Sequence, residues 1–572
     1  GGAPSANSPT AAAAPPQPTT ARPALAATVA PTSVAAQGAT AGARPTGSSP
    51  LLPNFIPAAG GPKPDLPSAG PLYEDAFVNY PKSPVKALLP EPPGAGSTVT
   101  AFEAALYPPP TPLDQNPAWQ AVNKALNADV RFNVVGLADY VTKLATVMSG
   151  NDLPDILYLQ RGINAAPDLP RFLQAKCADL TSYLAGDAAK DYPYLAAIPT
   201  YAWQNSGCAA SGKLQMVPIQ RYAPGVALFK NQTIYDSEIG KDTLPKNAAD
   251  YRKMLEQVNR PSQGRYGTAS YASTATSAVT GNAYSIDFYA AMFGAPNTWG
   301  LDASGKLTRS LETEEYKAAV GYIRDLVAAG LFHPNTLTYN INSARADFIA
   351  GSWVMYPEGF GNPWNDFWRR GLQMNPPVNF LPLPPFPAND GGAVQHYLSL
   401  GYQATTALKQ ASPDRIRELL RIMNWLAAPF GSQEDLLLAY GVKDIDYTFD
   451  DRGNPVVTDR GNGDANYVPW KYVVQHPQVI YVADIPGWAQ AASDAEHMLL
   501  PHGVADPTLG YYAPTSSSKG IPINQAFTDG ITDIVSGRRP MTDYDQLVSD
   551  WRSGGGEQIR REYQDAIAAA KA

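Results

Sequence analysis

The chain has 572 residues, a formal net charge of −8 at pH 7 and a sequence pI of about 5.3. Because this acidic balance comes without a basic stripe, we expect no nucleic-acid partner. No apolar stretch reaches the roughly 20 residues that a membrane-spanning helix needs, so we expect no transmembrane helix.

Residues 1–95 form a leader rich in Pro, Ala, Gly, Ser and Thr, with scarcely a charge before Lys63. Such a segment cannot bury enough apolar surface to offset its ordering entropy, which predicts a disordered, extended tether. The chain begins at Gly1 rather than Met, so we expect a processed product that has lost a signal peptide. We therefore predict an extracellular or periplasmic protein, anchored by an N-terminal lipid on a Cys that is not in this chain.

Cys177 and Cys208 are the two cysteines of the sequence. Their even number, their close spacing and the secretory character of the leader predict a disulfide between them. Such a bond would contribute about 3 to 4 kcal/mol through loop entropy. The alternative is a pair of buried thiols.

The body begins with a strand, helix, strand, helix, strand pattern. We expect strands at residues 97–102, 131–137 and 155–159, with helices at 117–126 and 138–148 between them. This βαβ order predicts a parallel sheet with right-handed crossovers. Ligands of such sheets bind beyond the carboxyl ends of the strands. The candidates at these ends are Glu103, Gln160 and Arg161.

Helical periodicity recurs along the rest of the chain, which is long enough to form two lobes. We expect helices at residues 247–258, 313–329 and 413–427, and a strand near 211–218. In the 313–329 helix, one face carries Tyr316, Ala319, Val320, Ile323 and Leu326. Residues 447–457 predict a β-hairpin around a Gly turn.

Six segments follow one another in an order that resembles a known family. They are residues 149–156, 178–181, 212–218, 316–331, 348–355 and 551–563. From about Thr98 to Ala572 the sequence resembles the extracellular, periplasmic-type solute-binding proteins of ABC importers, in the carbohydrate-associated and lipoprotein-like group called family 1. Each segment is weak evidence alone, and their order and spacing carry the resemblance.

The resemblance implies an α/β fold of two lobes, with a ligand cleft between them that closes by a hinge. The segments that cross between lobes would lie near residues 221–225, near 381–385 and soon after Leu408. The domain assignment is then as follows: 1–95 tether; 96–222 first part of lobe 1; 223–383 first part of lobe 2; 384–410 return to lobe 1; 411–572 return to lobe 2 and C-terminal helices. An importer would recognise the closed form, and we expect a monomer.

The chain carries 10 Trp and 31 Tyr, a heavy aromatic load. Sugar rings place apolar CH faces on aromatic rings, while their hydroxyls bind carboxylate, amide and guanidinium groups. Loop aromatics are better ligand candidates than those on helix faces. The predicted ligand-binding residues are Glu103, Gln160, Arg161, Arg221, Trp299, Trp353, Glu358, Trp364, Trp488, Tyr511 and Tyr512. The alternative is core packing for the tryptophans and exposed ion pairing for Arg221 and Glu358.

Signals of enzyme chemistry are thin. The five histidines are scattered, without HExxH or Cys/His metal spacing. Ser516-x-x-Lys519 lacks the partner motifs of serine acylases. The Asp444–Asp451 region has several carboxylates that could bind Ca²⁺ but no EF-hand spacing. We therefore predict no catalytic residues, no cofactor and no metal.

Together with the aromatic content, the resemblance implies a substrate-capture protein that binds a saccharide, an oligosaccharide in particular, and delivers it to the permease of an ABC importer. The rival interpretation is a secreted glycoside hydrolase or lyase acting on polysaccharide, which needs two carboxylates about 5 to 10 Å apart. A third is a cell-wall interaction protein.

Overall fold

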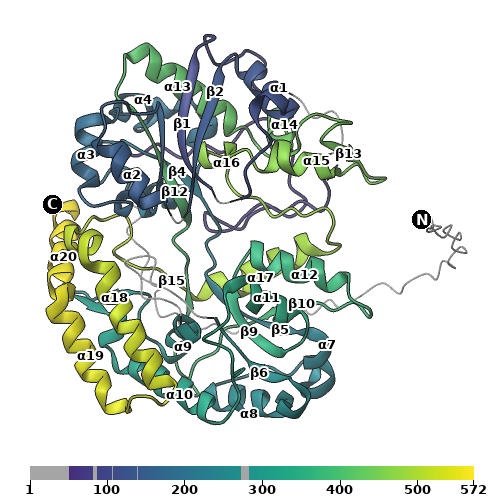
Figure 1. Ribbon diagram of the computed structural model, residues 1–572, viewed down its shortest axis with the longest axis vertical. Helices are drawn as coiled ribbons and strands as arrows, with labels where there is room; N and C mark the ends of the chain where they lie inside the picture. The colour runs from purple at the N-terminus through teal and green to yellow at the C-terminus, as the bar shows by residue number, and fades with distance from the viewer. Residues whose placement is uncertain (1–49, 82–86, 106, 138, 272–282, 572) are drawn as a thin grey trace, which may run out of the picture. The chain divides into compact units, whose positions relative to one another are not determined.

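The computed structural model describes residues 50–81, 87–105, 107–137, 139–271 and 283–571. These residues all belong to one compact unit that spans Ala41–Ala572. The unit contains two larger sheets, each with its own covering helices (Figure 1). Among the described residues, no helix has the length and apolar character needed to cross a membrane.

The first sheet has the strand order β2-β1-β3-β12-β4. Its strands are β1 (Thr98–Ala105), β2 (Asp129–Gly136), β3 (Ile156–Gln160), β4 (Val217–Gln220) and β12 (Tyr402–Leu408). Strand β1 pairs in parallel with β2 and β3, as the βαβ pattern predicts, whereas β12 is antiparallel to β3 and β4. The parallel part is local in sequence, whereas β12 follows β4 by about 180 residues, and the strands of the second sheet lie between them in the chain.

Helices cover the first sheet and share its core. They are α1 (Pro117–Leu126), α2 (Tyr140–Ser149), α3 (Leu169–Lys176), α4 (Thr181–Leu184), α5 (Pro193–Ala196), α6 (Thr200–Asn205), α13 (Pro413–Leu426), α14 (Gln433–Tyr440) and α16 (Trp470–Val473). Helix α1 shows why they begin where they do. The Asn116 side chain caps it by accepting from the Trp119 amide at 2.8 Å, and Pro117 occupies its first position.

Helix α13 corrects the predicted domain assignment. We assigned residues 411–572 to the second lobe and expected a crossing soon after Leu408. Instead α13 and α16 bury residues such as Leu419 and Trp470 in the core of the first sheet. The next buried residue in a core of the second sheet is Ile480, so the chain leaves the first lobe after Val474.

The second sheet has the order β10-β5-β9-β6 and a core on each face. Its strands are β5 (Val226–Asn231), β6 (Tyr266–Thr268), β9 (Trp353–Gly359) and β10 (Phe380–Leu383). Leu228 of β5 points into one core and its neighbour Phe229 into the other, as strand alternation requires. The second sheet is therefore the middle layer of a three-layer lobe.

Different helices cover the two faces of the second sheet. The helices of one core are α8 (Ala248–Val258), α9 (Ile286–Phe293), α10 (Glu314–Ala328), α18 (Pro514–Val535), α19 (Tyr544–Trp551) and α20 (Glu557–Lys571). Those of the other are α11 (Ile341–Ile349), α12 (Asn362–Leu372) and α17 (Trp488–Leu499). Helix α10 buries the five residues predicted for its apolar face. The C-terminal helices α18, α19 and α20, yellow in Figure 1, lie side by side.

Smaller elements complete the described chain. They are α7 (Gln232–Tyr235), α15 (Asp459–Gly461) and the strand pairs β7 (Trp299–Leu301) with β8 (Leu307–Arg309), β11 (His396–Tyr397) with β15 (Gly503–Val504), and β13 (Tyr447–Phe449) with β14 (Pro455–Val457). The last pair is the predicted hairpin. The parallel β11–β15 pair matters most here, because it joins two segments that border the cavity described below.

The prediction of a disordered tether over residues 1–95 is wrong for residues 50–81 and 87–95, and residues 1–49 and 82–86 lie outside the described part. Leu52 is buried in the core of the first sheet, and Ala76 pairs with Ile480 beside the second. Tyr80 donates from its hydroxyl to Asp435 at 3.1 Å. The average composition of residues 1–95 is rich in Pro and Ala, and the prediction overlooked the few apolar and aromatic residues whose burial holds residues 50–81 and 87–95 against the two sheets.

Candidate ligand-binding cavity

A cavity of about 640 Å³ lies where the segments that link the two sheets meet. Residues 221–225 link β4 to β5, and residues 384–401 link β10 back to β12. Both links line the cavity, together with β5, helix α9 and the stretch from Asp506 to Leu509. Because each link passes from one sheet to the other, a rotation of the lobes would change the shape of this cavity.

The two links run against each other and are tied by their backbones. Pro224 forms an antiparallel bridge with Leu398, and the Ser399 amide donates to the Ala223 carbonyl at 2.9 Å. The Gly225 amide donates to His396 Nε2 at 3.1 Å. A side chain at Gly225 would overlap the Tyr397 carbonyl, so this close approach requires glycine.

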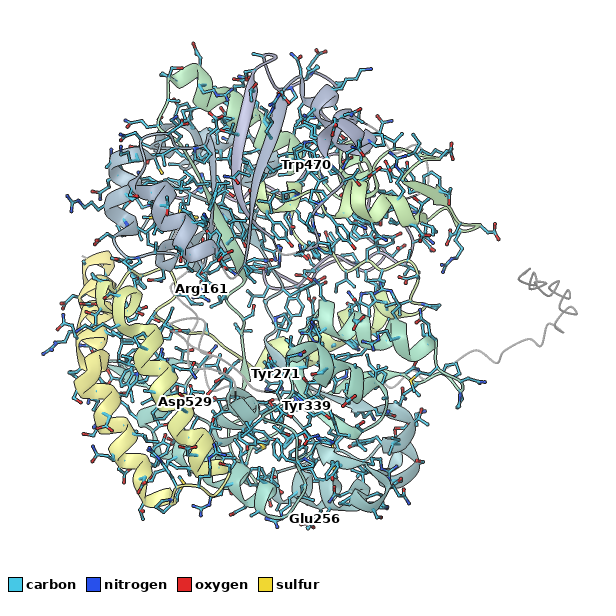
Figure 2. All side chains as sticks on the ribbon, viewed as in Figure 1. Arg161, Glu256, Tyr271, Tyr339, Trp470 and Asp529 are labelled. Atoms are coloured by element: carbon cyan, nitrogen blue, oxygen red, sulfur yellow. The ribbon has the colours of Figure 1, made fainter. Side chains whose placement is uncertain are left out.

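A second, smaller cavity of about 290 Å³ continues the first. The two share five lining residues, Thr298, Leu400, Tyr402, Asp506 and Leu509. We call the two together the linked cavity. The smaller part adds Arg161 from the first lobe, and Trp299, Arg309 and residues of α18 from the second. Figure 2 shows Arg161 at the end of the first lobe that lies opposite α13.

Burial shapes the charges of the linked cavity. Burial raises the pKa of the Asp287 carboxyl to about 6, although the nearby Arg309 charge acts in the opposite direction. Burial, with the His502 charge as a second cause, lowers the pKa of His396 to about 4, so this ring is neutral near pH 7. Burial also lowers the pKa of the Arg161 and Arg221 guanidinium groups, and arginine side chains stay protonated in proteins.

Aromatic rings line the larger part of the cavity. They belong to Tyr222, Phe288, Phe360, Phe386, Tyr397 and Tyr402. Polar groups are interspersed among them, and Asn297 Nδ2 donates to the carbonyls of Leu398 at 3.0 Å and Val504 at 2.8 Å. A concave site with mostly apolar walls and a few fixed polar groups is typical of small-molecule binding.

The sequence pattern of the bacterial extracellular solute-binding proteins matches residues 109–429, more than half of the chain. The chain belongs to this family. One relative is the polygalacturonan/rhamnogalacturonan-binding protein YtcQ of Bacillus subtilis (strain 168). It is 21% identical over 488 residues, which cover 82% of this chain and 91% of YtcQ.

Solved structures of solute-binding proteins share the fold. An extracellular solute-binding protein from Bifidobacterium longum subsp. infantis has a TM-score of 0.62 at 12% identity, over 83% of this chain and 99% of that one. The S. pneumoniae ABC-transporter substrate binding protein FusA, solved in complex with kestose, has a TM-score of 0.59 at 16% identity, over 82% and 99%. The chain therefore has the two-lobe α/β fold that the resemblance implies.

Three of the predicted ligand residues line the linked cavity of this solute-binding protein. Arg221 borders the larger part, and Arg161 and Trp299 border the smaller part. Trp299 is only 3% exposed, and its ring packs at 6.0 Å from Trp551 in the core covered by α18 to α20. Its role as a stacking platform stays a prediction.

Tyr511 and Tyr512 lie where a loop of the first lobe meets the start of α18. The Tyr512 hydroxyl accepts from the Asp168 amide at 3.0 Å, and Asn164 Nδ2 donates to the Tyr511 carbonyl at 3.4 Å. Both side chains are half-buried, and neither lines the linked cavity. Their hydrogen bonds join the two lobes directly.

Trp353, Trp364 and Trp488 correct the aromatic prediction. All three are buried in the core shared by α11, α12 and α17, and none lines the linked cavity. Trp364 Nε1 donates to the Phe380 carbonyl at 2.7 Å, and its ring lies 4.7 Å from that of Trp488. Glu358 is buried beside them and pairs with Arg345 at 3.1 Å, so it is no cavity residue either.

Glu103 and Gln160 stand at the predicted strand ends but do not border the linked cavity. Glu103 is fully buried, and this burial raises its pKa well above the usual range. It lies close enough to raise the pKa of Tyr140 and Tyr158 as well, after the larger effect of their own burial. The Gln160 amide donates to the Tyr140 hydroxyl at 3.3 Å.

The predicted disulfide is wrong. Cys177 and Cys208 are both free and buried, and burial raises the pKa of each thiol to about 12. Cys177 follows α3 and pairs its backbone with Lys409, while Cys208 follows α6 with its sulfur 3.2 Å from Ser206 Oγ. The alternative of two buried thiols holds, and burial keeps them protonated and unreactive.

Sequence reasoning missed Asp287, Asn297, His396, Tyr397 and Asp506, which all line the linked cavity. His396 and Tyr397 belong to a polar and aromatic run between two predicted crossings, which was the available signal. Asp506 had none, because its position depends on the β11–β15 pairing. Within the described residues, no group of three or more His, Cys, Asp and Glu side chains is placed to hold a metal ion.

Proposed function

We propose that this solute-binding protein captures a saccharide, specifically an oligosaccharide, in the linked cavity and delivers it unaltered to the permease of an ABC importer. The observation that carries the proposal is the lining of the cavity. Residues of both lobes and both linking segments contact the same space. A ligand that binds both lobes better when they are closed shifts the population toward the closed form.

The walls suit sugar rings. Phe288, Phe360 and Phe386 offer aromatic faces to the CH groups of a sugar, and Asn297, Asp287 and His396 lie close enough to serve its hydroxyls. The relatives support the same class of ligand, because YtcQ is named for binding polygalacturonan and rhamnogalacturonan and FusA was solved with kestose. A cavity of about 640 Å³ has room for more than one sugar ring.

The family supports a proposal for the location and the partners of the protein. The extracellular family fits a protein that works outside the cytoplasmic membrane, and we propose that the leader up to residue 49 tethers it there through an N-terminal lipid. The partners are then the saccharide and the permease subunits, and the protein acts as a monomer. We propose no catalytic role for the chain.

Calorimetric titration with a panel of oligosaccharides tests this proposal, followed by chromatography of the recovered sugar. We expect saturable binding of at least one oligosaccharide at one site per chain, and recovery of that sugar at its original length. Absence of binding across the panel contradicts the capture function. Recovery of shorter sugars with new reducing ends contradicts the receptor role and favours the hydrolase or lyase.

A further inference from the structure

Two arginines of the first lobe face the linked cavity. Arg161 directly follows β3, with its backbone in the left-handed region at φ 71°, and Arg221 directly follows β4. Arg161 borders the smaller part of the cavity and Arg221 the larger part. Both side chains are half-buried. The carboxyl ends of two strands therefore direct two positive charges toward one space.

Neither arginine has an acidic partner. Among the described residues, no carboxylate lies within 4 Å of the guanidinium nitrogens of Arg161 or Arg221. Every Asp and Glu side chain of the sequence falls within the described residues. Arg221 Nη1 donates to the Gln220 carbonyl at 2.7 Å, a contact that leaves the charge uncompensated.

Three other sheltered arginines of this protein are paired with carboxylates. Arg345 bonds Glu358 at 3.1 Å, Arg415 bonds Asp155 at 3.1 Å and Glu418 at 2.7 Å, and Arg560 bonds Glu312 at 2.5 Å. Their side chains are 23%, 19% and 11% exposed. Pairing with a carboxylate offsets the free-energy cost of removing a charged group from water. The two cavity arginines depart from this pattern.

A lysine of the first lobe, Lys471, lies close enough to Arg221 to be affected by its charge, but it does not line the linked cavity. The Lys471 ammonium group sits 4.1 Å from the centre of the Tyr107 ring. Burial lowers the pKa of Lys471, and the Arg221 charge lowers it further. The acids of the cavity, Asp287 and Asp506, belong to the second lobe and interact with Arg309 there. The charged side chains that line the linked cavity from the first lobe, Arg161 and Arg221, are thus both cationic in a protein whose net charge is −8.

We propose that the ligand is an anionic saccharide, and that Arg161 and Arg221 bind its anionic groups from the first-lobe side of the linked cavity. This inference rests on the proposed function and narrows it to one class of sugar. The shared chemistry is an oxyanion on a sugar ring, which can be a uronic-acid carboxylate or a sulfate ester. A guanidinium binds either through paired N–H groups, which fixes the orientation of the sugar as well as its charge.

Three matched probes separate the possibilities in calorimetric titrations. They are an oligogalacturonate, the same oligomer with its carboxyls methyl-esterified, and a sulfated galactose oligomer of the same length. We expect an anionic oligomer to bind at least about tenfold more tightly than the neutral one at low salt, with the preference shrinking as ionic strength rises. A carboxylate or a sulfate preference identifies the source of the anion, and both support the proposal.

Variants test the two arginines. R161Q and R221Q should each reduce the affinity for the preferred anionic oligomer about tenfold or more and leave the affinity for the neutral oligomer within a factor of three. The matched control is R417Q, which removes an exposed arginine paired with Asp414 away from the cavity and should preserve the preference. An unchanged preference in both cavity variants overturns the assignment.

The melting temperature of the ligand-free protein distinguishes a binding role of the two arginines from a structural role. Loss of an arginine that stabilises the fold would lower the melting temperature. Because Arg161 and Arg221 are sheltered and lack an acidic partner, R161Q and R221Q should keep or raise the melting temperature. R560Q removes the more buried of the two arginines that pair with Glu312, leaving Arg552 as its other partner, and should lower the melting temperature. Destabilisation of both cavity variants by as much as R560Q assigns the arginines to the scaffold and overturns the proposal.

The outcomes also separate this inference from the function beneath it. Equal or tighter binding of the neutral oligomer contradicts the anionic class and leaves the saccharide receptor intact. No binding of any probe, or of the wider oligosaccharide panel, contradicts both.

Discussion

Two groups of aromatic side chains in this protein lie in different surroundings. Trp364 and Trp368 of α12 pack against Trp488 of α17 in a core that is sealed from solvent. Phe288 and Tyr222, half-buried, line the linked cavity. The comparison teaches that aromatic abundance signals burial as readily as ligand binding, and that only the position relative to the linking segments distinguishes the two.

The largest effect should come from the sealed region. Trp364→Ala removes a fully buried ring and its hydrogen bond to the Phe380 carbonyl. We expect a loss of about 3 to 5 kcal/mol in the free energy of unfolding, measured by urea titration. If the variant keeps its stability and loses saccharide affinity instead, the assignment of this tryptophan to the core is wrong.

These regions also show how far the sequence could predict the structure. The βαβ start and the buried face of α10 were predictable, because their periodicity is local. The place of α13 in the first lobe was not, because it depends on packing against strands about 300 residues away. The sequence singled out Arg161 and Arg221 because each lies next to a predicted strand, which is a local signal. It could not separate Trp299 from the sealed tryptophans, because their surroundings depend on packing between distant segments.

A smaller effect, of opposite sign, is expected on the cavity wall. The folded pKa of Asp287, about 6, is raised above its usual 3.8, so the unfolded chain ionises first as the pH rises. This carboxyl therefore costs stability progressively between about pH 4 and pH 6, and the full cost persists above pH 6. Asp287→Asn should remove that cost.

We expect Asp287→Asn to be more stable than the parent protein above pH 6 by up to about 2 kcal/mol, a figure reduced because the side chain is half-buried. Below pH 4 the two should coincide. Urea titrations at pH 3.5, 5 and 7 measure the difference. A parallel pH dependence in the two proteins contradicts the role of Asp287.

The smallest effect is expected for an aromatic residue of the cavity wall. Phe288→Ala removes a ring from the cavity wall and should weaken saccharide binding by about 1 to 2 kcal/mol, with a smaller loss of stability than Trp364→Ala. Phe449→Ala, at an exposed position of β13, is the matched control and should bind normally. Equal affinities of the Phe288 variant and the control rule out a ring contact with the sugar.

The central claim is that a saccharide in the linked cavity draws the two lobes together. Small-angle X-ray scattering with and without a saccharide shown to bind by calorimetry tests this most directly, because the linking segments allow the lobes to rotate. The account predicts a smaller radius of gyration in the bound state. Identical scattering curves at saturating ligand would contradict it.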